Sequence, residues 1–150
     1  NQNSNMRKLL LFFFLVGCSK HNKCIGTFTK LDGSNSPQEV ILELADNSAE
    51  RSLGLMYRKS LDVDSGMLFI FPEESEKSFW MKNTYISLDI IFINQKNEVV
   101  SIKEGATPYS EESIPSHLPA RYVVELAAGS AKNYGIKTGS QFSFKCELKD

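Results

Sequence analysis

Short apolar runs separated by clusters of turn-forming residues dominate the chain from residue 24 onward. Strands are predicted over residues 24–29, 38–45, 67–71, 78–82, 87–93, 98–103, 121–126 and 141–148. The run 67–71 is continuously apolar, which is typical of a strand buried on both faces, and Pro72 is expected to end it. The pattern predicts a predominantly β, α+β domain. We expect a small antiparallel barrel-like or strongly curved sheet with one or two short helices.

Helix signals are confined to two segments. Asp46 or Asn47 can cap a helix that should end near residues 57–60. Leu53 and Met56 are three residues apart, so they are expected to face the core of the domain. A second short helix is predicted over residues 129–134.

A long segment over residues 105–119 breaks this alternation. It contains three prolines together with serine, glutamate and one histidine. Loops of this length without structure of their own are often lids or disordered. We expect it to be a loop that borders any binding site.

The N-terminal residues resemble a bacterial lipoprotein signal. Met6 is the expected start, and Arg7 and Lys8 precede the apolar stretch Leu9–Val16 and then Cys18. The stretch is shorter than the roughly 20 residues of a membrane span. Cys18 is the predicted lipidation site, which gives a membrane-anchored rather than membrane-spanning protein.

Three regions follow from this interpretation. Residues 1–17 are upstream sequence and signal peptide, 18–23 are a tether, and 24–150 are a single domain. The protein is then exported and faces the periplasm. Ser19, which is not Asp, favours the outer membrane.

The charge balance argues against nucleic acid as a partner. The formal net charge is −1, and it becomes −3 once Arg7 and Lys8 are removed with the signal peptide. A domain without a basic field has little attraction for phosphate backbones.

Two cysteines remain after lipidation, Cys24 and Cys146, near the two ends of the domain. In an exported protein they can form a disulfide or remain as two free thiols. A bridge between them would stabilise the fold by about 4 kcal/mol in the chain-entropy model.

Five motifs in this order give the chain a recognisable family character. They are Gly54-Leu55-Met56, Gly66-Met67-Leu68-Phe69, Phe79-Trp80-Met81-Lys82-Asn83-Thr84, Leu88-Asp89-Ile90-Ile91-Phe92 and Glu125-Leu126-Ala127-Ala128-Gly129. Over 39–144 the chain resembles the bacterial and archaeal family known as domain of unknown function 192. The resemblance implies a small, single-domain, β-rich protein of a kind that is often exported. It implies no established reaction.

The motif around Trp80 is the first candidate for a binding site. In a strand, Trp80 and Lys82 share one face while Phe79 and Met81 share the other. An aromatic ring beside a cation, an amide and a hydroxyl suits a sugar or a small polar anion. The predicted ligand-binding residues are Trp80, Lys82, Asn83 and Asp89, roofed by the loop 105–119, with Arg51, Arg121 and Glu125 in support.

A purely structural alternative stands beside this site. Trp80 would then be a core residue, Lys82 a solvated surface residue, and Asp89 a carboxylate satisfied by backbone N–H groups. The partner expected from the binding interpretation is a small polar ligand or an envelope component.

Two rival functions have weaker support. Met56, Met67 and Met81 offer soft thioether ligands for Cu(I), although methionine is also ordinary core filler. Asp89 and Glu125 could serve a carboxylate-dependent hydrolase acting on envelope carbohydrate, if the fold set them about 5 to 9 Å apart. His117 is a further candidate, but its position between prolines favours a solvated loop. We therefore favour a non-catalytic domain without cofactor or metal.

Overall fold

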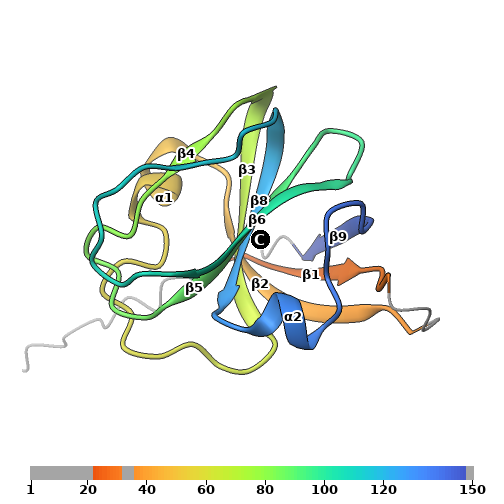
Figure 1. Ribbon diagram of the computed structural model, residues 1–150, viewed down its shortest axis with the longest axis horizontal. Coiled ribbons are helices and arrows are strands. Elements are labelled where there is room, and N and C mark those ends of the chain that lie inside the picture. The colour runs from red at the N-terminus through yellow and green to blue at the C-terminus, as the bar shows by residue number, and fades with distance from the viewer. Residues whose placement is uncertain (1–21, 32–35, 148–150) are drawn as a thin grey trace, which may run out of the picture.

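Seven strands form one strongly curved, mixed sheet (Figure 1). The computed structural model describes residues 22–31 and 36–147. The strand order is β6-β5-β8-β3-β2-β1-β9. The strands are β1 (Lys23–Phe28), β2 (Gln38–Ala45), β3 (Ser65–Ser75), β5 (Leu88–Ile93), β6 (Val99–Ala106), β8 (Ala120–Ala127) and β9 (Phe142–Glu147). A small second sheet pairs β4 (Ser78–Phe79) with β7 (Ile114–Pro115), and the helices are α1 (Ser48–Leu53) and α2 (Ser130–Asn133).

The expectation of an antiparallel sheet is wrong at one pair of strands. β2 and β3 run parallel, with Ile41 opposite Ser65 and Ala45 opposite Phe69. Parallel neighbours need a crossover connection rather than a tight hairpin. The segment 46–64, which contains α1, is that crossover.

The sheet curves without closing into a barrel. Its two edge strands approach each other where Glu98 forms an isolated bridge with Gln141. Backbone N–H groups of Val99 and Phe142 donate to the carbonyls of Ser140 and Asn97 at 2.9 and 2.8 Å. No continuous ladder joins β6 to β9 over residues 22–31 and 36–147. The strongly curved alternative therefore describes the fold, and the closed form does not.

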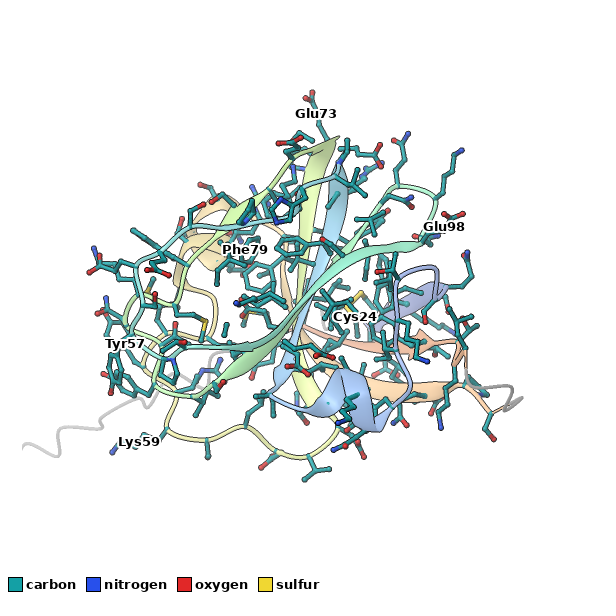
Figure 2. The ribbon with its side chains drawn as sticks, in the orientation of Figure 1. Cys24, Tyr57, Lys59, Glu73, Phe79 and Glu98 are labelled. Atoms are coloured by element: carbon teal, nitrogen blue, oxygen red, sulfur yellow. A yellow bond between two sulfur atoms is a disulfide. The ribbon has the colours of Figure 1, made fainter. Side chains whose placement is uncertain are left out.

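Hydrophobic cores lie on both faces of the sheet. The first contains Phe28, Leu42, Leu68, Ile91 and Val124 on the side of β1, β9 and α2. The second contains Phe69, Met81, Ile90, Phe92 and Val123 and lies under β4 and β7. Figure 2 shows Cys24 and Phe79 on the two sides. All six residues of β5 are buried, because both of its faces are covered.

Helix α1 is shorter than the sequence suggested. The Asn47 side chain accepts a hydrogen bond from the Glu50 N–H at 2.9 Å, which is the predicted cap. The helix ends at Leu53 because Gly54 adopts a positive φ of 49°. Leu53 is therefore exposed, and Leu55 takes the buried position that was expected of Leu53 and Met56.

Two other boundaries also differ from expectation. β3 continues past Pro72 to Ser75, and its register with β8 shifts between Ile70 and Ser75, so the proline lies at an irregularity of the ladder. The segment 105–119 contains β7, so it is not purely loop.

A disulfide bond joins Cys24 to Cys146. The two residues face each other in the register of β1 and β9. The bond therefore fixes the edge strand β9 to its neighbour at the end of the chain.

Candidate functional site

Trp80 lies on the surface beside Lys82. Trp80 is 46% exposed, whereas Met81 is completely buried. The Lys82 Nζ is 5.0 Å from the centroid of the Trp80 ring, and it also lies 3.7 Å from a Glu111 carboxylate oxygen. β4 ends at Phe79, so the strand predicted over residues 78–82 is too long, but Trp80 and Lys82 still lie together at the surface while Met81 is buried. The Trp80 ring is free to accept a contact from outside.

Asn83 connects two loops. Its backbone has a left-handed φ of 52°, which asparagine tolerates better than most residues. Its side-chain amide donates to the Tyr57 hydroxyl at 3.0 Å, and its backbone carbonyl accepts from the backbone N–H of Tyr57 at 2.9 Å. Asn83 therefore holds the Trp80 loop against the segment that follows α1.

Asp89 lies apart from the other predicted site residues. It is completely buried and accepts hydrogen bonds from the backbone N–H groups of Gly105 and Ala131, both at 2.9 Å. Its register partner on β8 is Leu126, a member of the first core. Trp80 lies on the opposite side of the sheet, so the four predicted ligand-binding residues do not form one site.

Replacing Asp89 by Asn should lower the free energy of unfolding by about 2 kcal/mol, because the amide cannot accept from both N–H donors. Chemical denaturation of the variant measures this loss. If Asp89→Asn changed ligand binding at Trp80 but not stability, the placement of Asp89 and Trp80 in separate sites would be contradicted.

The loop 105–119 runs alongside the Trp80 segment. The Met81 N–H donates to the Ser110 carbonyl, and the Ser116 N–H donates to the Lys77 carbonyl, both at 2.8 Å. Because β7 pairs with β4, the loop lies beside the Trp80 segment and does not cover it. The indole therefore remains exposed.

A small cavity beneath Trp80 contains a carboxyl that the sequence analysis placed only in a supporting role. The cavity has a volume of about 40 Å³. It is lined by Arg51, Ser52, Leu53, Gly54, Leu55, Met56, Phe69, Phe79, Trp80, Thr84 and Glu125. Eight of these eleven residues belong to four of the five family motifs, and the other three, Arg51, Ser52 and Leu53, directly precede the first motif.

Glu125 is 95% buried at this cavity. Among the residues that the structure describes, no hydrogen-bond or ion-pair partner reaches its carboxyl. Burial alone raises the pKa of Glu125 to about 8. The group is therefore mostly protonated at neutral pH, and its carboxyl oxygens, which have no protein partner in the described chain, keep some access to solvent.

Close approach of two strands positions Glu125. A Cβ atom placed on Gly66 would lie 2.0 Å from the Glu125 carbonyl oxygen. Only glycine fits at that point of β3, where Gly66 is next to Met67, the register partner of Glu125. Gly66 of the second family motif thus lets the backbone of Glu125 pack closely against β3.

A larger groove adjoins the cavity. It has a volume of about 340 Å³ and is lined by Ser48, Arg51, Ser52, Phe71, Ser78, Phe79 and Trp80. It shares Arg51, Ser52, Phe79 and Trp80 with the inner cavity. A third hollow of about 210 Å³ lies by Trp80 toward Glu111 and Ser113. Trp80 therefore forms a wall common to all three hollows.

The outer groove is basic at one end. The Arg51 guanidinium donates to the carbonyls of Asp46 and Ile70 at 2.7 and 3.0 Å, and its central carbon lies 5.2 Å from the centroid of the Phe71 ring. The Lys77 Nζ lies 4.4 Å from the same centroid. Burial and the nearby Arg51 charge lower the pKa of Lys77, and Glu73 and Glu74 partly offset this.

The arginines that were expected to support the site have other contacts. Arg121 donates from Nε to the Phe71 carbonyl at 3.4 Å. Arg51 is directed toward Phe71, and neither arginine forms an ion pair with Asp89 or Glu125 in the described part of the chain.

The geometry required by the hydrolase alternative is absent from the sheet. Glu125 is the register partner of Ile90, in the second core, whereas Asp89 is the partner of Leu126, in the first. Residues directly opposite in a ladder share a face. The sheet therefore separates the two carboxyls, which cannot flank one glycosidic bond as that mechanism requires.

Three methionines are core or cavity-lining residues. Met67 and Met81 are buried in the second core, and Met56 lines the inner cavity. Within residues 22–31 and 36–147, no group of three or more His, Cys, Asp or Glu side chains is arranged to hold a metal ion. No helix in the same ranges is long and apolar enough to cross a membrane.

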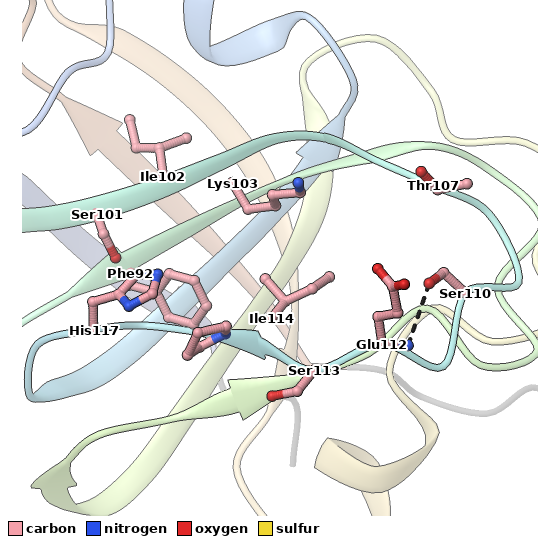
Figure 3. A pocket seen from close by; sticks show the side chains of 11 residues that line it. Phe92, Ser101, Ile102, Lys103, Thr107, Ser110, Glu112, Ser113, Ile114 and His117 are labelled. Carbon is pink, nitrogen blue, oxygen red and sulfur yellow. Dashed lines mark hydrogen bonds between the residues drawn. The ribbon is translucent and has the colours of Figure 1, made fainter.

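A separate pocket of about 230 Å³ lies between β6 and β7 (Figure 3). His117 and Glu112 stand at opposite ends of it, with Ile114 between them. Its three serine hydroxyls have partners: Ser101 donates to the Ser116 carbonyl at 2.7 Å, Ser110 accepts from the Glu112 N–H at 3.3 Å, and Ser113 shares a hydrogen bond with Ser78 at 2.7 Å. Its one carboxyl, on Glu112, is exposed, whereas Glu125 is buried.

One sequence signal could have identified Glu125. It interrupts the apolar run Val123-Val124-Glu125-Leu126, and a charged residue inside a buried strand needs an explanation. Cys18 and the predicted signal peptide lie outside the described residues.

Comparison with known proteins finds relatives that cover most of the chain. The chain is 29% identical to a UPF0127 protein of Pyrococcus furiosus over 111 residues, which are 71% of this chain and 90% of the relative. It resembles the crystal structure of a proposed transcription regulator from Sinorhizobium meliloti 1021, with a TM-score of 0.79, 37% identity, and coverage of 83% of this chain and 95% of that one.

A protein of unknown function from Novosphingobium aromaticivorans is similar at a TM-score of 0.74 and 37% identity, over 79% of this chain and 83% of that one. The sequence pattern of the family DUF192, described as "Uncharacterized ACR", matches residues 29–144. The chain therefore belongs to the DUF192 family.

Proposed function

We propose that this protein is a non-catalytic small-ligand-binding domain of the cell envelope, anchored by lipid at Cys18. The ligand would lie in the groove beside Trp80 and reach the cavity in which Glu125 is buried. The single observation that carries the proposal is the carboxyl of Glu125, which is 95% buried, has no partner among the described residues, and lines a cavity that adjoins an exposed tryptophan.

The energetics of Glu125 support a binding role. An isolated carboxyl in an apolar site destabilises the folded state, since its desolvation is not compensated. Residues with strongly perturbed pKa values in a cleft are candidates for functional sites. A purely structural residue at this position of β8 would be apolar like its neighbours Val123 and Val124. A ligand that completes the hydrogen bonding of Glu125 accounts for its presence.

The regulator description of the Sinorhizobium protein does not extend well to this chain. The present chain has a net charge of −1, which gives no general attraction to nucleic acid. An aromatic wall, several serine hydroxyls and one deep carboxyl suit a small molecule better.

A thermal-shift screen of small metabolites, sugars and amines tests the proposal. Trp80→Ala should lose the ligand-dependent rise in Tm, while its own stability changes by about 1 kcal/mol or less because the indole is half exposed. Tyr109→Ala is the matched control, since Tyr109 is an exposed aromatic outside the cavity and should keep the shift. Unfolding of Trp80→Ala, or an unchanged shift in it, would contradict the site.

The anchor is tested separately. Expressed with its leader in a bacterial host, the protein should incorporate radiolabelled palmitate and fractionate with membranes, whereas Cys18→Ser should do neither. Equal labelling of both forms would exclude Cys18 as the lipidation site. That result would leave the ligand site unaffected.

A further inference from the structure

Three side chains of the inner cavity, those of Thr84, Met56 and ionised Glu125, present acceptors to a ligand. The Thr84 hydroxyl already donates to the Lys82 carbonyl at 3.0 Å, so its oxygen offers only lone pairs. An ionised Glu125 offers two further acceptor oxygens, and the Met56 thioether is a weak acceptor. A group that brings several N–H donors would therefore match this end of the site.

Aromatic rings complete the surroundings. Phe69, Phe79 and Trp80 all line the cavity, and the first two pack edge to face with centroids 5.1 Å apart. The faces of such rings attract cations when the cation lies within about 6 Å of the centroid. An ammonium group would gain from these rings and from the carboxylate at once.

We propose that the inner cavity binds a primary ammonium group of the ligand, with Glu125 as its counter-ion. This inference rests on the proposed function and names the ligand class for the same site. The volume of about 40 Å³ has room for about three water-sized groups, which suits an aminomethyl terminus. The remainder of the molecule would lie along Trp80 in the outer groove.

The one other charged residue of the lining, Arg51, has one of its nitrogens held by backbone carbonyls. Its Nη1 is fixed by the Asp46 and Ile70 carbonyls, and its charge faces the Phe71 ring in the outer groove. Burial accounts for the whole perturbation of the Glu125 pKa, without a contribution from Arg51. An anionic terminus would meet the like charge of an ionised Glu125.

Proton linkage distinguishes an ammonium ligand from other classes. The ammonium needs Glu125 in its ionised form, so binding below pH 8 displaces one proton from the carboxyl to solvent. Affinity should rise about tenfold per pH unit from pH 6 to pH 7, and level off above pH 8. A neutral or anionic ligand needs the protonated form, so its affinity would be flat below pH 8 and fall above it.

The experiment uses three probes of nearly equal shape: benzylammonium, benzyl alcohol and benzoate. Trp80 is the only tryptophan in the chain, so its fluorescence reports occupancy of the groove directly. Titrations at pH 6, 7 and 8 are compared between the native protein, Glu125→Gln and the control Glu112→Gln. Glu112 is an exposed carboxylate in the separate pocket between β6 and β7.

Benzylammonium should bind the native protein and the control with affinity that rises with pH, and should lose at least tenfold in affinity for Glu125→Gln. If benzyl alcohol or benzoate bound preferentially and depended on Glu125, the ammonium assignment would be overturned while the proposed function stood. If none of the three altered Trp80 fluorescence, the ammonium assignment would also be overturned. The metabolite screen would then decide the proposed function.

Discussion

Replacing Cys24 and Cys146 together by alanine should lower the free energy of unfolding by about 4–5 kcal/mol. The disulfide links residues 122 positions apart, so it removes much of the conformational freedom of the unfolded chain. It also joins β1 to β9, an edge strand whose ladder has one partner in the described sheet. For a domain of this size such a loss is a large part of the total stability.

Urea denaturation of the native protein and the double variant measures this effect. Reductant should destabilise the native protein by a similar amount and leave the double variant unchanged. A difference below about 1 kcal/mol, with the native disulfide shown intact by mass spectrometry, would contradict the account. It would mean that the first core holds β9 without the covalent bond.

Glu125→Gln should stabilise the protein, by up to about 3 kcal/mol at pH 7. The carboxyl has an ordinary pKa of 4.5 and a raised pKa of about 8 in the fold. Between these values the folded protein keeps a proton that the unfolded chain releases. Each rise of one pH unit in this window therefore lowers the free energy of unfolding of the native protein by about 1.4 kcal/mol.

The sign of the pH dependence follows from the same values. The contribution of Glu125 to stability is most favourable below about pH 4.5, declines as the pH rises, and is constant above about pH 8. Glutamine has nearly the same shape and cannot ionise, so the variant should lack this decline. The difference between the two proteins isolates Glu125 from every other titrating group.

Denaturation curves from pH 5 to pH 8.5 give the measurement. The two proteins should be nearly equally stable at pH 5 and diverge steadily up to about pH 8. Glu112→Gln, at an exposed site, should follow the native curve. Parallel curves for the native protein and Glu125→Gln would show that the carboxyl is not isolated. A residue that lowers stability at a cavity beside an exposed tryptophan is best explained by function.

Much of the fold was predictable because its strands alternate or are continuously apolar. The sequence correctly indicated a β-rich domain, the Asn47 cap and the two faces of the segment from Phe79 to Lys82. Parallel pairing of β2 with β3 was not predictable, since local pattern does not encode which strands become neighbours. Gly54 ended α1 through its backbone conformation, which hydrophobic spacing alone did not reveal.

The sequence predicted one part of the candidate site, Trp80, but not the role of Glu125. Trp80 stood out by residue type, and it does line the hollows. Asp89 and Glu125 looked alike in sequence, as single carboxylates in apolar strands. The structure distinguishes them by their partners: Asp89 accepts two backbone N–H groups, whereas Glu125 has no partner in the described chain. Only the packing of other segments around each carboxyl decides which one is available to a ligand.

The most direct test of the central claim is the titration of the Glu125 carboxyl carbon by ¹³C NMR in the ligand-free protein, with Glu125→Gln to assign the signal. An isolated, buried carboxyl facing an unfilled cavity predicts a pKa of about 8. A pKa near 4.5 would mean that the group is solvated or already paired, and would contradict both the site and the function proposed for it.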